Sequence, residues 1–174
     1  MAKLRPGRCY RKLKRPYTRI SYKNPRKSYV KGVPPPRIRQ FEMGKKGDYS
    51  AVVYLIAKRA CQIRHNALEA ARVVALKHVE KKLKEFFMRV RVYPHHVLRE
   101  NPLATGAGAD RYQKGMRLAF GKPIGTAAQV DAGQILMEIQ VPKEHLKLAK
   151  EALKKASYKL PTPCRIVVAK VEKS

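Results

Sequence analysis

The first 41 residues of this chain carry fourteen lysines and arginines and not one aspartate or glutamate. Prolines at positions 6, 16, 25 and 34–36 interrupt the same stretch, and four tyrosines lie among its cations. Proline and unbalanced charge together prevent a local hydrophobic core, whereas arginine and tyrosine are suited to phosphates and to the faces of bases. We therefore predict that residues 1–36 form an extended basic arm that becomes ordered on RNA. A solvated, disordered tail is the alternative interpretation.

The charge of the whole chain points to a polyanionic partner. Forty basic residues against twelve acidic ones give a formal net charge of +28, and half of that excess lies in the first 41 residues. A compact fold with such an excess repels itself unless an anion screens it. The hydrophobic share of 44% is nonetheless close to that of ordinary globular domains. The chain is therefore predicted to be a globular body that binds nucleic acid.

From residue 37 onward the periodicity predicts a single α+β domain over 37–174. Residues 49–58 are apolar on both faces, which indicates a covered strand. Residues 62–84 follow a helical period, in which Asn66 and Glu69 have the spacing of a capping box. The apolar stripe of this helix is expected to comprise Ile63, Ala67, Ala71, Val74, Ala75, Val79 and Leu83. Residues 86–94 alternate, with Phe86, Met88, Val90 and Val92 on one face and Arg89 and Arg91 on the other, as in a strand with one cationic face.

The second half repeats the same kinds of element. Residues 116–141 are predicted to form strands, with turns or bulges at Gly121, Gly125 and Gly133. Pro142 is predicted to open a helix that ends before Pro161, and residues 164–171 form a last strand. This order of elements predicts an α+β fold in which two amphipathic helices pack on a mainly antiparallel sheet.

Residues 101–115 follow neither the helical period nor the alternation of a strand. They contain three glycines and several alanines but almost no apolar anchors, so we expect a flexible loop. A structureless segment of this length inside a compact domain is usually functional or disordered. The stretch lacks the spacing of a phosphate-binding loop. A mobile loop that brings its backbone close to a partner is one interpretation, and a surface loop without a role is the other.

Patterns typical of catalysis and of metal binding are missing from the sequence. None of the twelve carboxylates forms a DxD, ExxE or ExxH pair that would hold a divalent ion, and no GxSxG motif is present. Cys9, Cys61 and Cys164 lie far apart and make no CxxC pair, which fits a reducing compartment. The N-terminus lacks the apolar run of a signal peptide, and no stretch is long and apolar enough to span a bilayer. We expect an intracellular protein with no catalytic residue, cofactor, metal or membrane contact.

Five segments make the sequence recognisable in this order. They are RPGRCYR at 5–11, GVPPPRIRQFEMG at 32–44, ALEAAR at 67–72, RVRVYPHHVLREN at 89–101 and AGADRYQKGMRLAFGKPIGTAAQVDAGQ at 107–134. With them the chain closely resembles the ribosomal protein L ten-e family of the large subunit, the archaeal and eukaryotic counterpart of bacterial L sixteen. The resemblance runs from about residue 3 to residue 171. The short C-terminus resembles the archaeal form.

The resemblance implies a specific role. Members of the family bind large-subunit rRNA near the central protuberance, beside the aminoacyl-tRNA corridor, and join late in assembly. It implies a hammerhead-type α+β fold, a cytoplasmic location on the ribosome, neighbouring ribosomal proteins as partners and no homo-oligomer. It also implies that the loop projects towards the peptidyl-transferase centre and the acceptor ends of tRNA. Peptide-bond chemistry would belong to the RNA.

Two sets of site residues follow from the basic faces and from the resemblance. The expected rRNA ligands are Arg5, Arg8, Tyr10, Arg11, Lys12, Lys14, Arg15, Arg19, Arg37, Arg39, Arg64, Arg72, Arg89, Arg91, Arg99, Arg117 and Lys122. The expected tRNA-proximal loop comprises Asn101, Pro102, Leu103, Ala104, Thr105, Gly106, Ala107, Gly108, Ala109, Asp110, Arg111, Tyr112, Gln113 and Lys114. Two other classes of protein stay open at this point: a free-standing RNA or DNA binder of the RNA-chaperone or chromatin type, and an RNA-processing enzyme.

Overall fold

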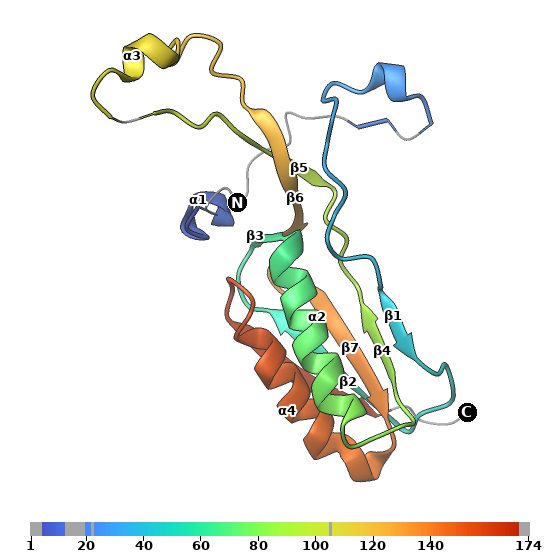
Figure 1. The fold of residues 1–174 in the computed structure, drawn as a ribbon. Coiled ribbons are helices and arrows are strands. Elements are labelled where there is room, and N and C mark those ends of the chain that lie inside the picture. Colours follow the sequence, from blue (N-terminus) through green and yellow to red (C-terminus); the bar gives the residue numbers. More distant parts are fainter. Residues whose placement is uncertain (1–4, 13–19, 22, 105, 171–174) are drawn as a thin grey trace.

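The body of the molecule is a five-stranded antiparallel sheet with two helices on one face (Figure 1). The computed structural model describes residues 5–12, 20–21, 23–104 and 106–170. The strand order is β1-β4-β7-β2-β8. These strands are β1 (Glu42–Gly44), β2 (Ala51–Ala57), β4 (Phe87–Val90), β7 (Ile135–Val141) and β8 (Cys164–Lys170). The helices are α2 (His65–Glu80) and α4 (Leu146–Ser157), and a 3-10 turn over Lys143–His145 precedes α4.

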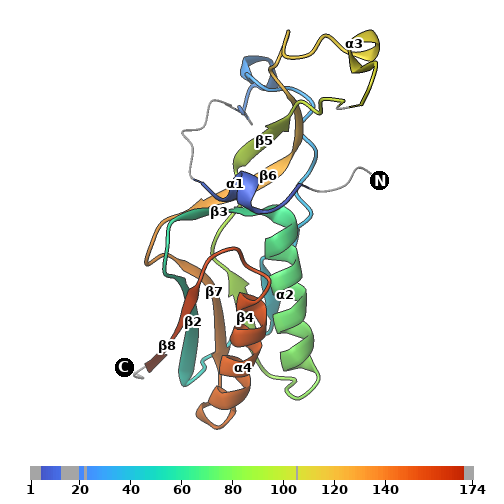
Figure 2. The same cartoon turned by 90° about the vertical axis from the view of Figure 1, so that its left-hand side faces the viewer.

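A second, three-stranded antiparallel sheet lies beyond the N-terminal end of α2 (Figure 2). Its order is β3-β6-β5, with β3 over Cys61–Arg64, β5 over His96–Glu100 and β6 over Lys122–Val130. The connection between β5 and β6 projects away from the body and contains the short helix α3 (Ala109–Tyr112). The structure thus confirms the antiparallel α+β fold with two main helices, but divides the strands between two sheets.

The hydrophobic core fills the space between α2, α4 and the five-stranded sheet. Small residues line the helix contact, since Ala71, Ala75, Ala149 and Ala156 are all fully buried. Short side chains let the two helices approach each other closely, and larger residues from the strands fill the volume beneath them. Those larger residues include Val53, Leu55, Met88, Met137 and Ile139. Among the described residues, no helix is long and apolar enough to cross a bilayer.

The start of the first main helix differs from the prediction. Helix α2 begins at His65, and Ile63 belongs to β3, where it pairs with Ala128. The four residues of β3 run directly into α2, so their apolar side chains imitate the first turn of the helical period. The helical stripe therefore begins with the buried Leu68 rather than with Ile63. The capping box is also wrong, because no side chain caps α2 and Glu69 pairs with Arg72 instead.

The strands of residues 116–141 are shorter than predicted. β6 begins at Lys122, so residues 116–121 belong to the connection and not to a strand. The turn between β6 and β7 contains Gly133, whose φ of +84° favours glycine over other residues. Gly125 pairs with Leu98 at a register shift between β5 and β6, as its predicted place at a bulge requires.

The extended N-terminal arm is not confirmed. Residues 8–11 form a helical turn, α1, which lies against β3 instead of extending away from the body. Further along, Val30 is buried, and Ser28 Oγ accepts a hydrogen bond from the backbone N–H of Ser21 at 3.0 Å. Three of the expected rRNA ligands, Lys14, Arg15 and Arg19, lie outside the described residues.

The buried His65 and the half-buried His96 lie at the junction of the two parts of the fold. The Nδ1 atom of His65 accepts a hydrogen bond from the backbone N–H of Arg37 at 3.2 Å. Burial, and then the charges of Arg37 and Arg64, lower the pKa of His65 below its ordinary value of 6.5. Burial and the charge of Arg99 lower the pKa of His96 in the same direction. Both imidazoles are therefore held neutral in the folded protein.

This arrangement predicts that the protein loses stability in mild acid. The unfolded chain takes up these protons at a pH near 6.5, before the folded protein does, so protonation favours unfolding. The melting temperature should fall as the pH drops from about 6.5 towards the lower pKa values of the folded protein. In calorimetric scans, the melting temperature of the double variant His65→Gln, His96→Gln should depend less steeply on pH than that of wild type. The melting temperature of His95→Gln, which changes an exposed histidine, should depend on pH as in wild type. Equal slopes for all three proteins would contradict the assignment.

Candidate nucleic-acid interface

Glu100, the last residue of β5, holds the N-terminal segment against the body. Its carboxylate accepts hydrogen bonds from Arg5 Nε and, at 3.1 Å, from the Tyr10 hydroxyl. The guanidinium of Arg64 lies 4.5 Å from the centre of the Tyr10 ring. Gln62 Nε2 donates to the backbone carbonyl of Lys12 at 2.7 Å. These four contacts fix residues 5–12 over β3 and leave Arg8, Arg11 and Lys12 exposed.

The charges of Arg5 and Glu100 and the protonated hydroxyl of Tyr10 maintain these contacts. Burial, and then the hydrogen bond to Glu100, raise the pKa of Tyr10, so its hydroxyl stays a proton donor. The carboxylate also raises the pKa of Arg5. Sequence reasoning did not single out Glu100. Its position as the only carboxylate between Glu85 and Asp110 was the available signal, because an isolated acid among cations often has a structural partner.

Aromatic and cationic side chains meet again at the base of the β5–β6 connection. The guanidinium of Arg99 lies 3.6 Å from the centre of the Phe120 ring. Tyr29 meets the same ring edge to face, with ring centroids 6.0 Å apart. Both Tyr29 and Phe120 are more than half exposed. Exposed aromatic rings beside arginine can stack on unpaired bases.

The connection itself is braced at its base and within its length. A Cβ on Gly121 would lie 2.4 Å from the backbone carbon of Glu100, so only glycine fits where the two stems meet. Inside the loop, the Gln113 amide makes two hydrogen bonds to the backbone of Ala104, at 2.8 and 2.9 Å. Tyr112, at 87% exposed, and Leu118, at 81%, extend into solvent beyond these braces. The stretch 101–114 thus includes a short helix and internal bonds besides its glycines.

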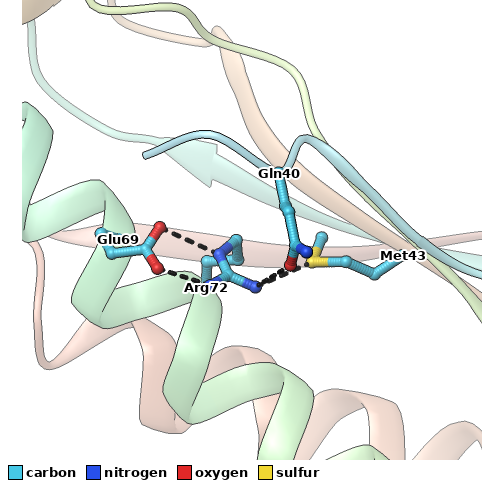
Figure 3. Close-up of polar contacts among 4 residues, drawn as sticks. All are labelled: Gln40, Met43, Glu69 and Arg72. Carbon is cyan, nitrogen blue, oxygen red and sulfur yellow. Dashed lines mark hydrogen bonds and ion pairs between the residues drawn. The ribbon is translucent and has the colours of Figure 1, made fainter. Parts of the chain in front are cut away.

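Arg72 lies inside the protein rather than on its surface (Figure 3). Its guanidinium donates to both oxygens of Glu69, to Gln40 Oε1 at 3.2 Å and to Met43 Sδ at 3.4 Å. The network joins α2 to the segment that leads into β1. These contacts already use the guanidinium as a donor, so we assign Arg72 to the stability of the fold and not to the RNA-facing surface.

The Arg72 network makes a direct prediction about stability. Arg72→Met should lower the free energy of unfolding by about 1–3 kcal/mol, because the acceptors on Glu69 and Gln40 lose a buried donor. Urea denaturation followed by circular dichroism measures this change. Lys77→Met on the exposed face of the same helix is the matched control and should change the stability by less than about 0.5 kcal/mol. Equal losses in the two variants would contradict the structural role.

Arg89 and Arg91 lie on the sheet face opposite the helices, as predicted, but neither is free of acidic neighbours. Arg89 Nε lies 3.4 Å from Glu42, and Arg91 Nη1 lies 3.2 Å from Glu138. Glu138 is buried, so Arg91 compensates a carboxylate that would otherwise lack a counterion. Reversing the charge of Arg91 would place two carboxylates together. It would therefore disturb the fold as well as any RNA contact.

The remaining expected ligands fall into two groups. Arg37 and Arg39 are exposed on either side of the fully buried Ile38, which anchors their segment in the core. Arg117 and Lys122 are exposed along the connection and at the start of β6. Together with the N-terminal cluster, these side chains place cations around the three-stranded sheet. In the described part of the chain, no group of three or more histidine, cysteine or acidic residues is arranged to hold a metal ion.

Comparisons with known proteins show the family to which the chain belongs. The model of the family described as ribosomal protein L16p/L10e matches residues 17–167. A protein of Staphylothermus marinus named large ribosomal subunit protein uL16 is 55% identical over 168 residues, which cover 94% of this chain and 92% of the relative. Proteins of the same name from Sulfolobus acidocaldarius and Archaeoglobus fulgidus are 53% and 49% identical, and cover 98% and 95% of this chain and 96% and 93% of their own lengths. On this evidence the chain belongs to the ribosomal protein L16p/L10e family.

Proposed function

We propose that this protein is a structural constituent of the large ribosomal subunit and binds large-subunit rRNA without being an enzyme. The observation that carries the proposal is the near full-length identity of about half to relatives named as large-subunit proteins. The net charge of +28 supports it independently, because a permanent polyanionic partner would relieve the repulsion within the fold. The neighbours of the protein would then be rRNA and other ribosomal proteins, and it would act as a single copy.

The proposed rRNA contacts are the exposed and partly exposed cations around the three-stranded sheet. Lysine and arginine neutralise phosphates and release counterions, which gives affinity with little sequence information. Folded rRNA would be recognised mainly by its shape, with occasional stacking on tyrosine. We propose this role for Arg8, Arg11, Lys12, Arg37, Arg39, Arg64, Arg99, Arg117 and Lys122, and for the arm over residues 1–36 as a whole. Arg5 and Tyr10 hold the arm to Glu100 and would present it to the RNA.

The connection between β5 and β6 is proposed to approach tRNA. The projection of residues 101–114 from the body, well away from the helices, supports this role. The window 101–142 has four basic and three acidic residues, so it is nearly neutral in an otherwise strongly basic chain. Strong phosphate binding there would retard a tRNA that must enter and leave. The loop would help to position the acceptor ends of tRNA near the peptidyl-transferase centre and to complete late assembly.

Sedimentation tests the proposed function directly. Tagged protein expressed in an archaeal host should migrate with the large subunit through a sucrose gradient and remain there in moderately high salt. Crosslinks from the exposed arginines should then map to large-subunit rRNA. A free-standing RNA or DNA binder would instead leave the particle in that salt and distribute over many nucleic acids. That second outcome would overturn the ribosomal assignment.

A further inference from the structure

A pocket of about 340 Å³ lies where three distant segments of the chain meet. The segment with α1 forms one wall with Arg5 and Tyr10, and the junction of β3 and α2 forms the second with Gln62 and Asn66. The third wall is the stretch after α4, from Tyr158 to Pro161. The contacts of Glu100 with Arg5 and Tyr10 hold the first wall in place. The pocket is therefore part of the folded protein and has a volume typical of a ligand site.

The polarity of the pocket favours an anionic group. Arg64 and Asn66 stand at the N-cap and in the first turn of α2, a helix of 16 residues. Among the described residues, no side chain caps this helix and no acidic residue occupies its first turn. Its free N–H groups carry a partial positive charge that attracts phosphate. Arg5, Arg64 and Lys159 surround the same space with three cationic side chains.

Two hydrogen-bond acceptors that lack donors belong to residues in the wall of the pocket. Gln62 is only 4% exposed, and its Nε2 is occupied by the carbonyl of Lys12. Its Oε1 and the Oδ1 atom of Asn66 are buried without a hydrogen-bond partner among the described residues. A buried acceptor without a donor is costly, so each such atom calls for a partner. A phosphodiester or an ionised carboxylate cannot provide one, whereas a ribose 2′-hydroxyl can.

An aromatic ring completes the set of groups. Tyr158 is 71% exposed at the mouth of the pocket, although it directly follows the last turn of α4. The other tyrosine of the pocket, Tyr10, is already covered by the guanidinium of Arg64. Tyr158 therefore presents a free ring face, on which an unpaired base can stack.

We propose that this pocket binds one unpaired ribonucleotide of the rRNA. Its phosphate lies at the N-terminus of α2 beside Arg64 and Lys159, its 2′-hydroxyl donates its one proton to the amide oxygen of Asn66, and its base stacks on Tyr158. The inference rests on the proposed rRNA-binding function and adds to it a site that distinguishes ribose from deoxyribose. A polyglutamate chain fits less well, because it has no ring to stack on Tyr158.

Fluorescence anisotropy with the full chain tests the pocket. The probes are a labelled hexamer of adenosine and its 2′-deoxy counterpart, which carry the same charge. Wild type should bind the ribose form more tightly, by roughly tenfold for a gain of about 1.4 kcal/mol. Asn66→Ala should remove most of this preference, while Tyr158→Ala should weaken both hexamers by roughly 5- to 150-fold. Lys159→Gln should reduce the slope of log affinity against log salt by about 1.

Matched controls separate the pocket from general basicity. Tyr112→Ala removes an exposed tyrosine on the loop, and Lys150→Gln removes an exposed cation on α4. Both should leave the preference for ribose unchanged. Tyr158 is largely exposed, so its variant should keep the wild-type melting temperature even if Asn66→Ala does not fold. Equal affinity of wild type for the two hexamers would overturn the proposal. So would pocket variants that behave like the controls, or a polyglutamate that competes as well as the ribose hexamer.

The outcome is independent of the sedimentation experiment. If wild type remains with the large subunit while the hexamers bind equally, the pocket proposal fails and the ribosomal role stands. If the preference for ribose holds but the protein leaves the particle in salt, the ribosomal role fails and the pocket remains a ribonucleotide site.

Discussion

Raising the salt concentration from about 50 to about 200 mM is expected to weaken binding of the free protein to a large-subunit rRNA fragment by roughly 10³–10⁵-fold. This range applies if about six to ten phosphates are engaged. The exposed cations of the N-terminal segment and of the three-stranded sheet are numerous enough to reach that number. Filter binding across a salt series measures the effect, and a flat titration would contradict the electrostatic mechanism.

Two variants should differ in how steeply their RNA affinity depends on salt. Neutralising Arg8 and Arg11 together should reduce the slope of log affinity against log salt by about 2, one unit for each phosphate contact. Arg72→Met removes the same kind of charge from the interior and should leave the slope unchanged, although it lowers the stability. If Arg72→Met changed the slope as much as the loss of a surface arginine, our assignment of its guanidinium to the fold would be wrong.

Deleting residues 104–110 is expected to impair tRNA placement with little effect on the fold. None of the described residues of this stretch belongs to the hydrophobic core, and the pairing of β5 with β6, which holds the stems, lies outside the deletion. Peptide synthesis by subunits that carry the variant should slow, by up to about 10²-fold if the acceptor end shifts by about 1 Å. Single-turnover peptide-bond assays on purified subunits measure this rate.

A second variant of the loop distinguishes the effect of its length from the effect of its side chains. Tyr112→Ala keeps the loop length, and it should keep most of the peptide-synthesis rate if the length of the loop determines that rate. Both variants should retain the wild-type melting temperature and sediment with the large subunit. A deletion that lowered the melting temperature but left peptide synthesis unchanged would show that the loop is structural and has no role at the tRNA.

The elements with long, regular periods were predictable from the sequence. β2 was predictable as an interior strand, since it lies between β7 and β8. One of its faces is fully buried, and the other, with Tyr54 and Ile56, is partly exposed. Helix α4 lies within the predicted range, and Ala149, Leu153 and Ala156, at a helical spacing in the sequence, are fully buried. β3 was not predictable, because four residues are too few to show alternation and they continue into α2 without a break. Because β3 is one of the three strands of the second sheet, that sheet was not predictable either.

The cationic character of the candidate site was predictable from the sequence, but the ion pairs that its arginines form were not. The surplus of cations is visible in the sequence, yet which cations are free depends on contacts between distant segments. Arg91 meets Glu138 across 47 positions, and no sequence period relates the two. Arg72 and Glu69 are the exception, since their spacing of three residues on a helix is a recognised pairing distance. That local signal was the available evidence for an internal arginine.

The bond between Arg5 and Glu100 also bears on the order in which the chain folds. Its partners are 95 positions apart, so during synthesis the N-terminal segment leaves the exit tunnel long before its anchor exists. At roughly 5–20 residues per second, the interval is about 5–20 s. Through that time the most basic part of the chain is exposed to every nucleic acid nearby. The first segment to be made is thus among the last to reach its native place.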